Sequence, residues 1–128
     1  MKVMGLMLVL CTLVLRGDDA ALAIGRAVWV EPAQHDTEVA MADELQKWGR
    51  WKIVGEEKEA DLLVRLRVSG NSVWGRGKVQ VFIIDARSRK TVYTSRVQTG
   101  NRTIFHGWIS PYSRAISGIV KRMREDLG

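Results

Sequence analysis

Few residues in this chain have side chains suited to catalysis or metal binding. It has two histidines, His35 and His106, and one cysteine, Cys11, and none belongs to a local cluster of histidine, cysteine and carboxylate residues at metal-ligand spacing. His35 is expected in the loop before the first helix. No motif places a serine or cysteine as an activated nucleophile. The sequence therefore predicts no metal, no cofactor and no catalytic residue, and we expect a protein that is not an enzyme.

A better candidate site is formed by two expected loops, residues 70–77 and 99–110. In consecutive antiparallel strands, the loops after Ser69 and Gln98 emerge at the same end of the sheet. Together they gather aromatic and basic groups suited to stacking on sugars or to holding a protein partner. These partner-binding candidates are Trp74, Arg76, Asn101, Arg102, Phe105, His106 and Trp108.

The same loops also allow simpler interpretations. Trp74, Phe105 and Trp108 could close over the end of the core with no partner. The glycines of residues 70–77 lack the fixed spacing of phosphate-binding loops, so this stretch is expected to be a hairpin connection. Asn101-Arg102-Thr103 matches the N-glycosylation acceptor pattern, which matters only in a eukaryotic secretory pathway.

The elements that must position these loops follow from hydrophobic periodicity. Strands are predicted over residues 25–32, 51–54, 60–69, 78–85 and 91–98, and helices over 36–48 and from Pro111 to Leu127. Asp36 is expected to cap the first helix, and Gly49 to end it. The fold class is α+β, a two-layer α/β sandwich with a mixed five-stranded sheet and two main helices in the order β-α-β-β-β-β-α.

The same periodicity predicts which side of each element faces the core. Along the third strand, alternate residues are apolar, whereas Leu63, Arg65 and Arg67 lie on the other, partly wet face. In the fourth strand Phe82 and Ile84 give that second face apolar weight too. The predicted core-facing residues are Val39, Ala42, Leu45 and Trp48 in the first helix, Leu62, Val64, Leu66, Val68, Val79, Val81 and Ile83 in the sheet, and Tyr112, Ile116, Ile119, Val120, Met123 and Leu127 in the last helix.

The beginning of the chain has the features of a secretory signal peptide. Lys2 is followed by an apolar run up to Leu15, and residues 21–23 form an A-x-A cleavage site. The run is too short for an ordinary transmembrane helix. Cys11 is preceded by leucine and not by a small residue, so lipidation is not expected. We predict residues 1–23 as the signal peptide, residues 24–128 as a single α/β domain, and a periplasmic or secreted location.

The chain is basic, with a net charge of +6. The predicted signal contains two basic and two acidic residues, so its removal leaves the charge unchanged. Positive charge favours anionic partners, which outside the cytoplasm are lipid headgroups, acidic glycans or acidic proteins more often than nucleic acid. A solvated basic surface without a partner is the other interpretation.

Three short segments resemble a known group of proteins. They are Trp48-Gly49-Arg50-Trp51-Lys52-Ile53-Val54, Glu59-Ala60-Asp61-Leu62-Leu63-Val64 and Val81-Phe82-Ile83-Ile84-Asp85-Ala86-Arg87. With the preceding strand and helix, these segments resemble small exported bacterial envelope domains, among them the amino-terminal domain of TolB, the periplasmic domain of the curli secretion channel and outer-membrane activators of peptidoglycan synthases. The resemblance implies an envelope domain that binds other proteins or assembles on a membrane, and its motifs carry no active site.

Three functions therefore compete at the level of sequence. The first is an exported, non-enzymatic binding or assembly domain of the bacterial cell envelope that recognises a protein partner through loops 70–77 and 99–110 or a sheet edge. The second is a basic module for anionic glycans or membrane surfaces, which would use cations at Arg76, Arg87, Arg89, Lys90, Arg102 and the last helix. The third is a small enzyme whose site the order of residues does not reveal.

Overall fold

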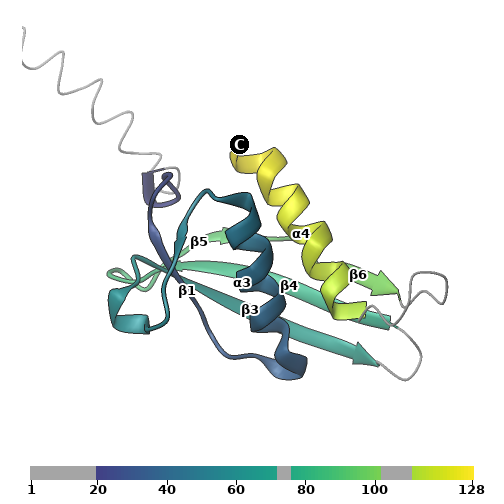
Figure 1. Cartoon of the computed structure of the whole chain (residues 1–128). Coiled ribbons are helices and arrows are strands. Elements are labelled where there is room, and N and C mark those ends of the chain that lie inside the picture. Colours follow the sequence, from purple (N-terminus) through teal and green to yellow (C-terminus); the bar gives the residue numbers. More distant parts are fainter. Residues whose placement is uncertain (1–19, 72–75, 102–110) are drawn as a thin grey trace, which may run out of the picture.

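The computed structural model describes residues 20–71, 76–101 and 111–128 and contains a mixed six-stranded sheet with two helices on one face (Figure 1). Strands β2 (Lys52–Ile53), β1 (Ala27–Val30), β3 (Leu62–Asn71), β4 (Arg76–Asp85) and β5 (Thr91–Thr94) follow one another across the sheet, and β6 (Gln98–Asn101) also pairs with β4. The helices are α3 (Thr37–Trp48) and α4 (Pro111–Leu127). The predicted α+β class is confirmed.

The first half of the domain is a parallel unit in which β1 lies between β2 and β3. Both neighbours run parallel to β1, and α3 connects β1 to β2. Gly49 ends α3 as predicted, since its φ of 77° is left-handed and its N–H reaches the Leu45 carbonyl at 3.1 Å. Parallel strands need such a crossover, and here the helix covers the sheet between them.

The start of α3 differs from the expectation in one detail. Asp36 occupies the N-cap position, but its backbone is left-handed and its side chain forms no capping hydrogen bond. Instead, the Thr37 hydroxyl donates to the Gln34 carbonyl at 2.8 Å, and the Glu38 carboxylate accepts the Ala33 N–H at 3.1 Å. Neighbouring side chains therefore close the turn that Asp36 was expected to close.

The predicted core face of α3 is also partly wrong. Val39 is 63% exposed, whereas Met41 and Leu45 are fully buried. The short 3-10 turn η1 (Gln34–Asp36) precedes the helix and fixes its rotation, so that Thr37, Met41 and Leu45 share the buried side. This four-residue spacing is the ordinary buried face of a helix.

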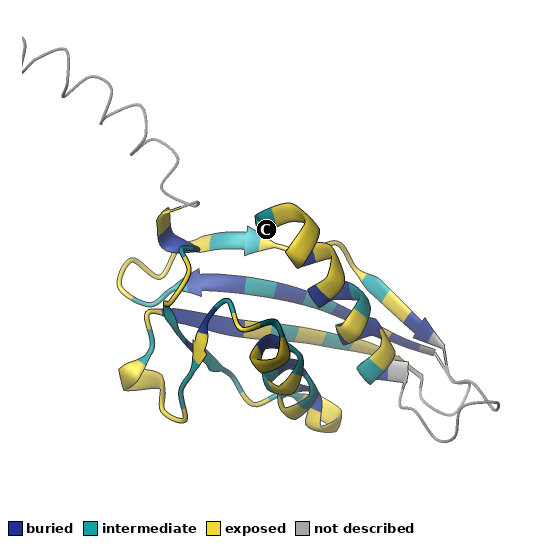
Figure 2. Ribbon diagram, turned by 45° about the horizontal axis from the view of Figure 1, so that its top comes forward, coloured by how far each residue is buried: buried dark blue, intermediate teal, exposed yellow. Residues whose placement is uncertain are grey.

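The second half is antiparallel and supplies most of the core. β3 and β4 form a hairpin paired along ten residues each, from Leu62 opposite Asp85 to Asn71 opposite Arg76. The predicted alternation is confirmed: Val79, Val81 and Ile83 are fully buried against the helices, and in α4 every predicted apolar residue belongs to the core or packs against it. The outward sides of both helices are exposed (Figure 2).

The last predicted strand is in fact two short strands, which gives six strands where five were expected. β5 pairs with the second half of β4 and β6 with the first half, both on the same edge. Between them Ser95 is buried; its N–H donates to the Val81 carbonyl at 2.9 Å, and its hydroxyl accepts the Val81 N–H at 2.8 Å. One serine thus satisfies the β4 backbone where the edge strand is interrupted.

Gly77 permits the close approach of α4 to the sheet. A Cβ atom at Gly77 would lie 2.8 Å from the Tyr112 ring, well inside van der Waals contact. The other side of the Tyr112 ring is stacked on His35, with centroids 4.6 Å apart. Because residue 77 has no side chain, the Tyr112 ring can pack against both β4 and His35, which lies before α3.

We predict that Gly77→Ala destabilises the protein by about 1–3 kcal/mol, because the added methyl overpacks the Tyr112 ring. Denaturant unfolding followed by circular dichroism measures this change. Gly55→Ala is the matched control, since a Cβ there meets no atom within 4 Å. Equal unfolding midpoints for the two variants would show that Tyr112 moves aside at no cost.

Arg50 joins the beginning and the end of the described chain. Its Nε and Nη2 atoms donate to the Leu22 carbonyl at 3.0 and 2.8 Å, and Nη1 donates to the Leu127 carbonyl at 3.0 Å. The guanidinium lies 5.7 Å from the ring centroids of both Trp48 and Trp51. The Leu22 side chain is 2% exposed and belongs to the core.

These contacts bear on the predicted signal peptide, most of which lies outside the described residues. Its cleavage after Ala23 stays a prediction. A cut there would remove the Leu22 side chain and both carbonyls, of Leu22 and Ala23, that accept the Trp51 indole N–H at 3.3 and 3.1 Å. Residues 20–23 thus contribute to the folded domain whenever they are present.

We expect a chain beginning at Ile24 to be less stable than one beginning at Ala20. Loss of a buried leucine costs about 2–5 kcal/mol, and the Arg50 and Trp51 donors lose their acceptors. Thermal unfolding of the two chains tests this. Leu22→Ser in the longer chain should reproduce much of the loss, and identical midpoints for both chains would refute a structural role for residues 20–23.

Candidate partner-binding surface

The sequence-predicted loop cluster falls mainly outside the described residues. Trp74, Arg102, Phe105, His106 and Trp108 lie there, and their placement stays a prediction. The two other members are placed by their backbones, because Arg76 begins β4 and Asn101 ends β6.

The strand ends show where these loops originate. Arg76 pairs with Asn71 of β3 on one side and with Asn101 of β6 on the other. Three adjacent strand ends therefore meet at one end of the sheet, and the segments that follow Asn71 and Asn101 both leave from there.

A second candidate surface is the face of the sheet opposite the helices, which we call the open face. The register assigns its members, because residues directly opposite each other in an antiparallel pair share a face. Arg65 lies opposite Phe82, Arg67 opposite Gln80, and Leu63 opposite Ile84. Further open-face residues, by the same alternation, are Ser69 and Lys78, which pair with each other, and Trp29, which pairs with Leu63.

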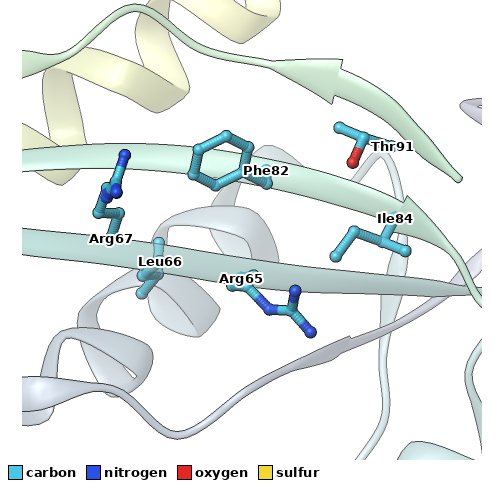
Figure 3. A pocket seen from close by; sticks show the side chains of 6 residues that line it. All are labelled: Arg65, Leu66, Arg67, Phe82, Ile84 and Thr91. Atoms are coloured by element: carbon cyan, nitrogen blue, oxygen red, sulfur yellow. The ribbon is translucent and has the colours of Figure 1, made fainter. Parts of the chain in front are cut away.

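The centre of the open face contains a hollow of about 440 Å³ (Figure 3). It is lined by Arg65, Leu66, Arg67, Phe82, Ile84 and Thr91. Phe82 is half-buried and Ile84 buried, whereas both arginines are exposed. An apolar floor between cationic side chains is unusual for the solvated face of an antiparallel sheet, whose residues are ordinarily polar.

The two arginines of the hollow differ in their partners. Arg65 forms a bidentate pair with Glu31, with Nε–Oε2 and Nη2–Oε1 distances of 2.8 and 3.1 Å. The hydrogen bond and the charge of this carboxylate raise the pKa of the Arg65 guanidinium. Within the described part of the chain, Arg67 and Lys78 make no side-chain hydrogen bond or ion pair. The positive charge of Arg67 and Lys78 is thus not compensated there.

A second hollow of about 520 Å³ adjoins the other end of the hairpin, lined by Glu57, Lys58, Ala60, Leu63, Ala86, Arg87 and Arg89. The turn above it is held by Asp85, whose carboxylate accepts the backbone N–H groups of Arg87 and Ser88 at 2.9 and 3.0 Å. The Asp-Ala-Arg segment therefore has a structural role as an Asx turn. Two of the three cations of this hollow are paired with carboxylates, Arg89 with Glu57 at 3.4 Å and Lys58 with Glu56 at 3.3 Å.

The described residues lack both a metal-binding cluster and a helix able to span a membrane. Residues 20–71, 76–101 and 111–128 contain no group of three histidine, cysteine or carboxylate side chains that could hold a metal. In these same ranges no helix has the length and apolar character to cross a membrane. What the open face can do is bind, with cations and an apolar floor side by side.

The Asp85 turn adds one carboxylate's contribution to the acid dependence of stability. Its hydrogen bond from the Ser88 backbone lowers the pKa of Asp85. The ionised form is favoured by folding, so its contribution is present above the unfolded pKa of about 3.9 and is lost as pH falls through the lower folded pKa. We expect Asp85→Asn to flatten the pH dependence of unfolding below pH ~4, while Glu59→Gln, at an exposed carboxylate without a side-chain bond among the described residues, leaves it steep. Identical acid profiles for Asp85→Asn and the parent would contradict this assignment.

The fold defines a class of two-layer α+β domains. No family model matches the chain, and a search of curated proteins found no match. Among solved structures, the chain is similar to the LpoB C-terminal domain from Salmonella enterica, with 9% identity, a TM-score of 0.49, and 62% of this chain and 85% of that one covered. It is also similar to PelC from Paraburkholderia phytofirmans, described as a dodecamer, with 22% identity, a TM-score of 0.49, and coverages of 83% and 88%.

A third similar structure is a minor lipoprotein from Acinetobacter baumannii, with 13% identity, a TM-score of 0.42, and coverages of 82% and 92%. All three proteins come from bacteria, and the Acinetobacter protein is described as a lipoprotein. Identities and scores this low support no statement about function. TolB and the curli channel are not among the three, so the resemblance to them stays a prediction.

The sequence predicted only some features of the open face. Alternation placed Arg65 and Arg67 on the wet side of one strand, and Phe82 and Ile84 were recognised as apolar residues on the outer side of the next. What was missing was the register that sets Arg65 opposite Phe82. A two-residue hairpin turn would have fixed that register in advance, but the expected loop over residues 70–77 was too long: residues 70, 71, 76 and 77 are paired in the strands, and the connection is residues 72–75.

Proposed function

We propose that the chain is a non-catalytic binding domain of the bacterial envelope that recognises a protein partner. The observation that carries this proposal is the hollow of the open face, where exposed arginines flank a half-buried Phe82 and a buried Ile84. Aromatic and arginine side chains next to each other are typical of the energetic centres of protein interfaces. The envelope location depends on the secretory features of the first residues.

The proposed surface includes the end of the sheet where the loops begin. Ser69 and Lys78 continue the open face toward Asn71 and Arg76, from which the predicted loop cluster follows. A partner lying along β3 and β4 would therefore reach residues 70–77 as well. In this way the loop hypothesis and the open face describe one continuous binding region.

The sheet edges are less suited to a partner strand. β2 has two residues, and the opposite edge consists of two strands of four residues each, interrupted at residues 95–97. A partner strand needs a continuous row of free backbone groups. These edges offer only short rows of free backbone groups, so the open face is the better candidate for partner binding.

A basic module for anionic glycans or membranes is the second candidate. Arg87 and Lys90 lie on the turn after β4, and Lys121 and Arg124 are exposed on α4 in the helix layer. These cations lie on different sides of the molecule, so they do not form one patch that a flat anionic surface could cover. Their dispersion argues against this function.

Site-specific photo-crosslinking tests the proposed function. The full chain is produced in its native envelope with p-benzoylphenylalanine in place of Ser69 on the open face, or in place of Lys121 on α4 as the control. Both positions are exposed. We expect a discrete protein adduct from position 69 and none from position 121. The same adducts from both positions, or none from position 69, would exclude the open face as the binding surface.

A further inference from the structure

Two cations without a partner among the described residues lie in a row on the open face. Arg67 of β3 faces Gln80, and one step further along the hairpin Lys78 faces Ser69. Side chains two residues apart on a strand lie about 7 Å apart on one face. Along β4 the residues of this face are Lys78, Gln80, Phe82 and Ile84 at that interval, and Arg67 lies beside Gln80 on the neighbouring strand β3. The face thus presents a row with positive charge at one end and apolar groups at the other.

An extended peptide has the same periodicity. Its alternate side chains point to one side and are also about 7 Å apart. A peptide lying along β4 can therefore place one side chain over Lys78, the next over Gln80 and the adjacent Arg67, and two more over Phe82 and Ile84.

The open face already accepts a carboxylate at one position. Glu31 binds Arg65 with two hydrogen bonds, and its side chain is 23% exposed. Bidentate binding of this kind is the strongest ordinary recognition of a carboxylate by arginine. Arg67 offers the same guanidinium two residues further along the strand, on the same face, and no described residue forms a hydrogen bond or ion pair with it.

We propose that the open face binds an extended acidic segment of the partner, with carboxylates over Lys78 and Arg67 and apolar side chains over Phe82 and Ile84. The inference rests on the proposed function and names the chemistry of the partner. The matching sequence has acidic residues at its first and third positions and apolar residues at its fifth and seventh. Charge complementarity and spacing together select it.

Other occupants fit less well. Two copies of this chain placed face to face would bring the uncompensated Arg67 and Lys78 of both copies into one interface, while Glu31, a carboxylate of this face, is already bound to Arg65. An anionic glycan offers carboxylates but no aliphatic side chain for the hollow. A bilayer surface needs apolar groups that protrude, whereas Phe82 is half-buried and Ile84 buried within the sheet.

Fluorescence anisotropy with a synthetic peptide tests the inference. The probe is a labelled peptide with glutamate at the first and third positions, leucine at the fifth and seventh, and serine elsewhere; the control peptide carries glutamine in place of glutamate. We expect the full chain to bind the acidic probe, and Arg67→Glu to weaken binding about tenfold or more. The matched variant Arg124→Glu makes the same change of charge on α4 and should leave the affinity within about twofold.

Several results would overturn the inference. They are equal binding of the glutamine peptide, an equal loss of affinity with Arg124→Glu, or tighter binding and displacement of the probe by polygalacturonate or phosphatidylglycerol vesicles. Circular dichroism of Arg67→Glu and of the milder Arg67→Gln confirms that each variant is folded. If the probe fails to bind while position 69 still gives its protein adduct, the acidic-segment inference is wrong and the proposed function stands. If neither probe binding nor a protein adduct at position 69 is observed, the acidic-segment inference and the proposed function are both wrong.

Discussion

The structure depends on one arginine that ties together segments far apart in sequence. Arg50 follows α3, yet its guanidinium holds the Leu22 carbonyl near the start of the described chain and the Leu127 carbonyl at the end of α4. A cation at a helix C-terminus also opposes the partial negative charge of the last carbonyls. The flanking indoles of Trp48 and Trp51 shield this charge from water. Both termini of the domain are thus fixed against the crossover between β1 and β2.

The two sides of the sheet differ in what covers them. Helices α3 and α4 cover one side with a continuous apolar core that includes Met41, Leu45 and Met123. The other side has no helix among the described residues, and there Arg65 and Arg67 of β3 lie beside Phe82 and Ile84 of β4 (Figure 3). The stabilising core and the proposed binding surface therefore use opposite faces of the same two long strands. Exposed open-face positions such as Arg67 can be substituted without touching that core.

Much of this fold could be predicted from the sequence, and the errors have physical causes. Strict alternation in residues 62–68 identified both faces of β3, and the apolar stripe of α4 was complete, because in each case burial on one side dominates the choice of residues. Val39 was misplaced because the rotation of a helix depends on the turn before it, and the left-handed backbone of His35 and Asp36 is not apparent from their types. The interruption at Ser95 was missed because Thr, Val and Tyr around it favour strand throughout. The register between β3 and β4 could not be predicted, so the neighbours of Arg65 and Arg67 on the open face could not be predicted either.

The interrupted edge affects how copies of this domain could pair with one another through their sheets. An uninterrupted strand over residues 91–101 would present an edge of eleven residues, whose outward-pointing backbone groups form a template for further chains. Ser95 turns this edge inward to satisfy Val81, and Val97, 56% exposed, follows in the gap. One buried hydroxyl therefore shortens the row of free backbone groups with which another chain could pair.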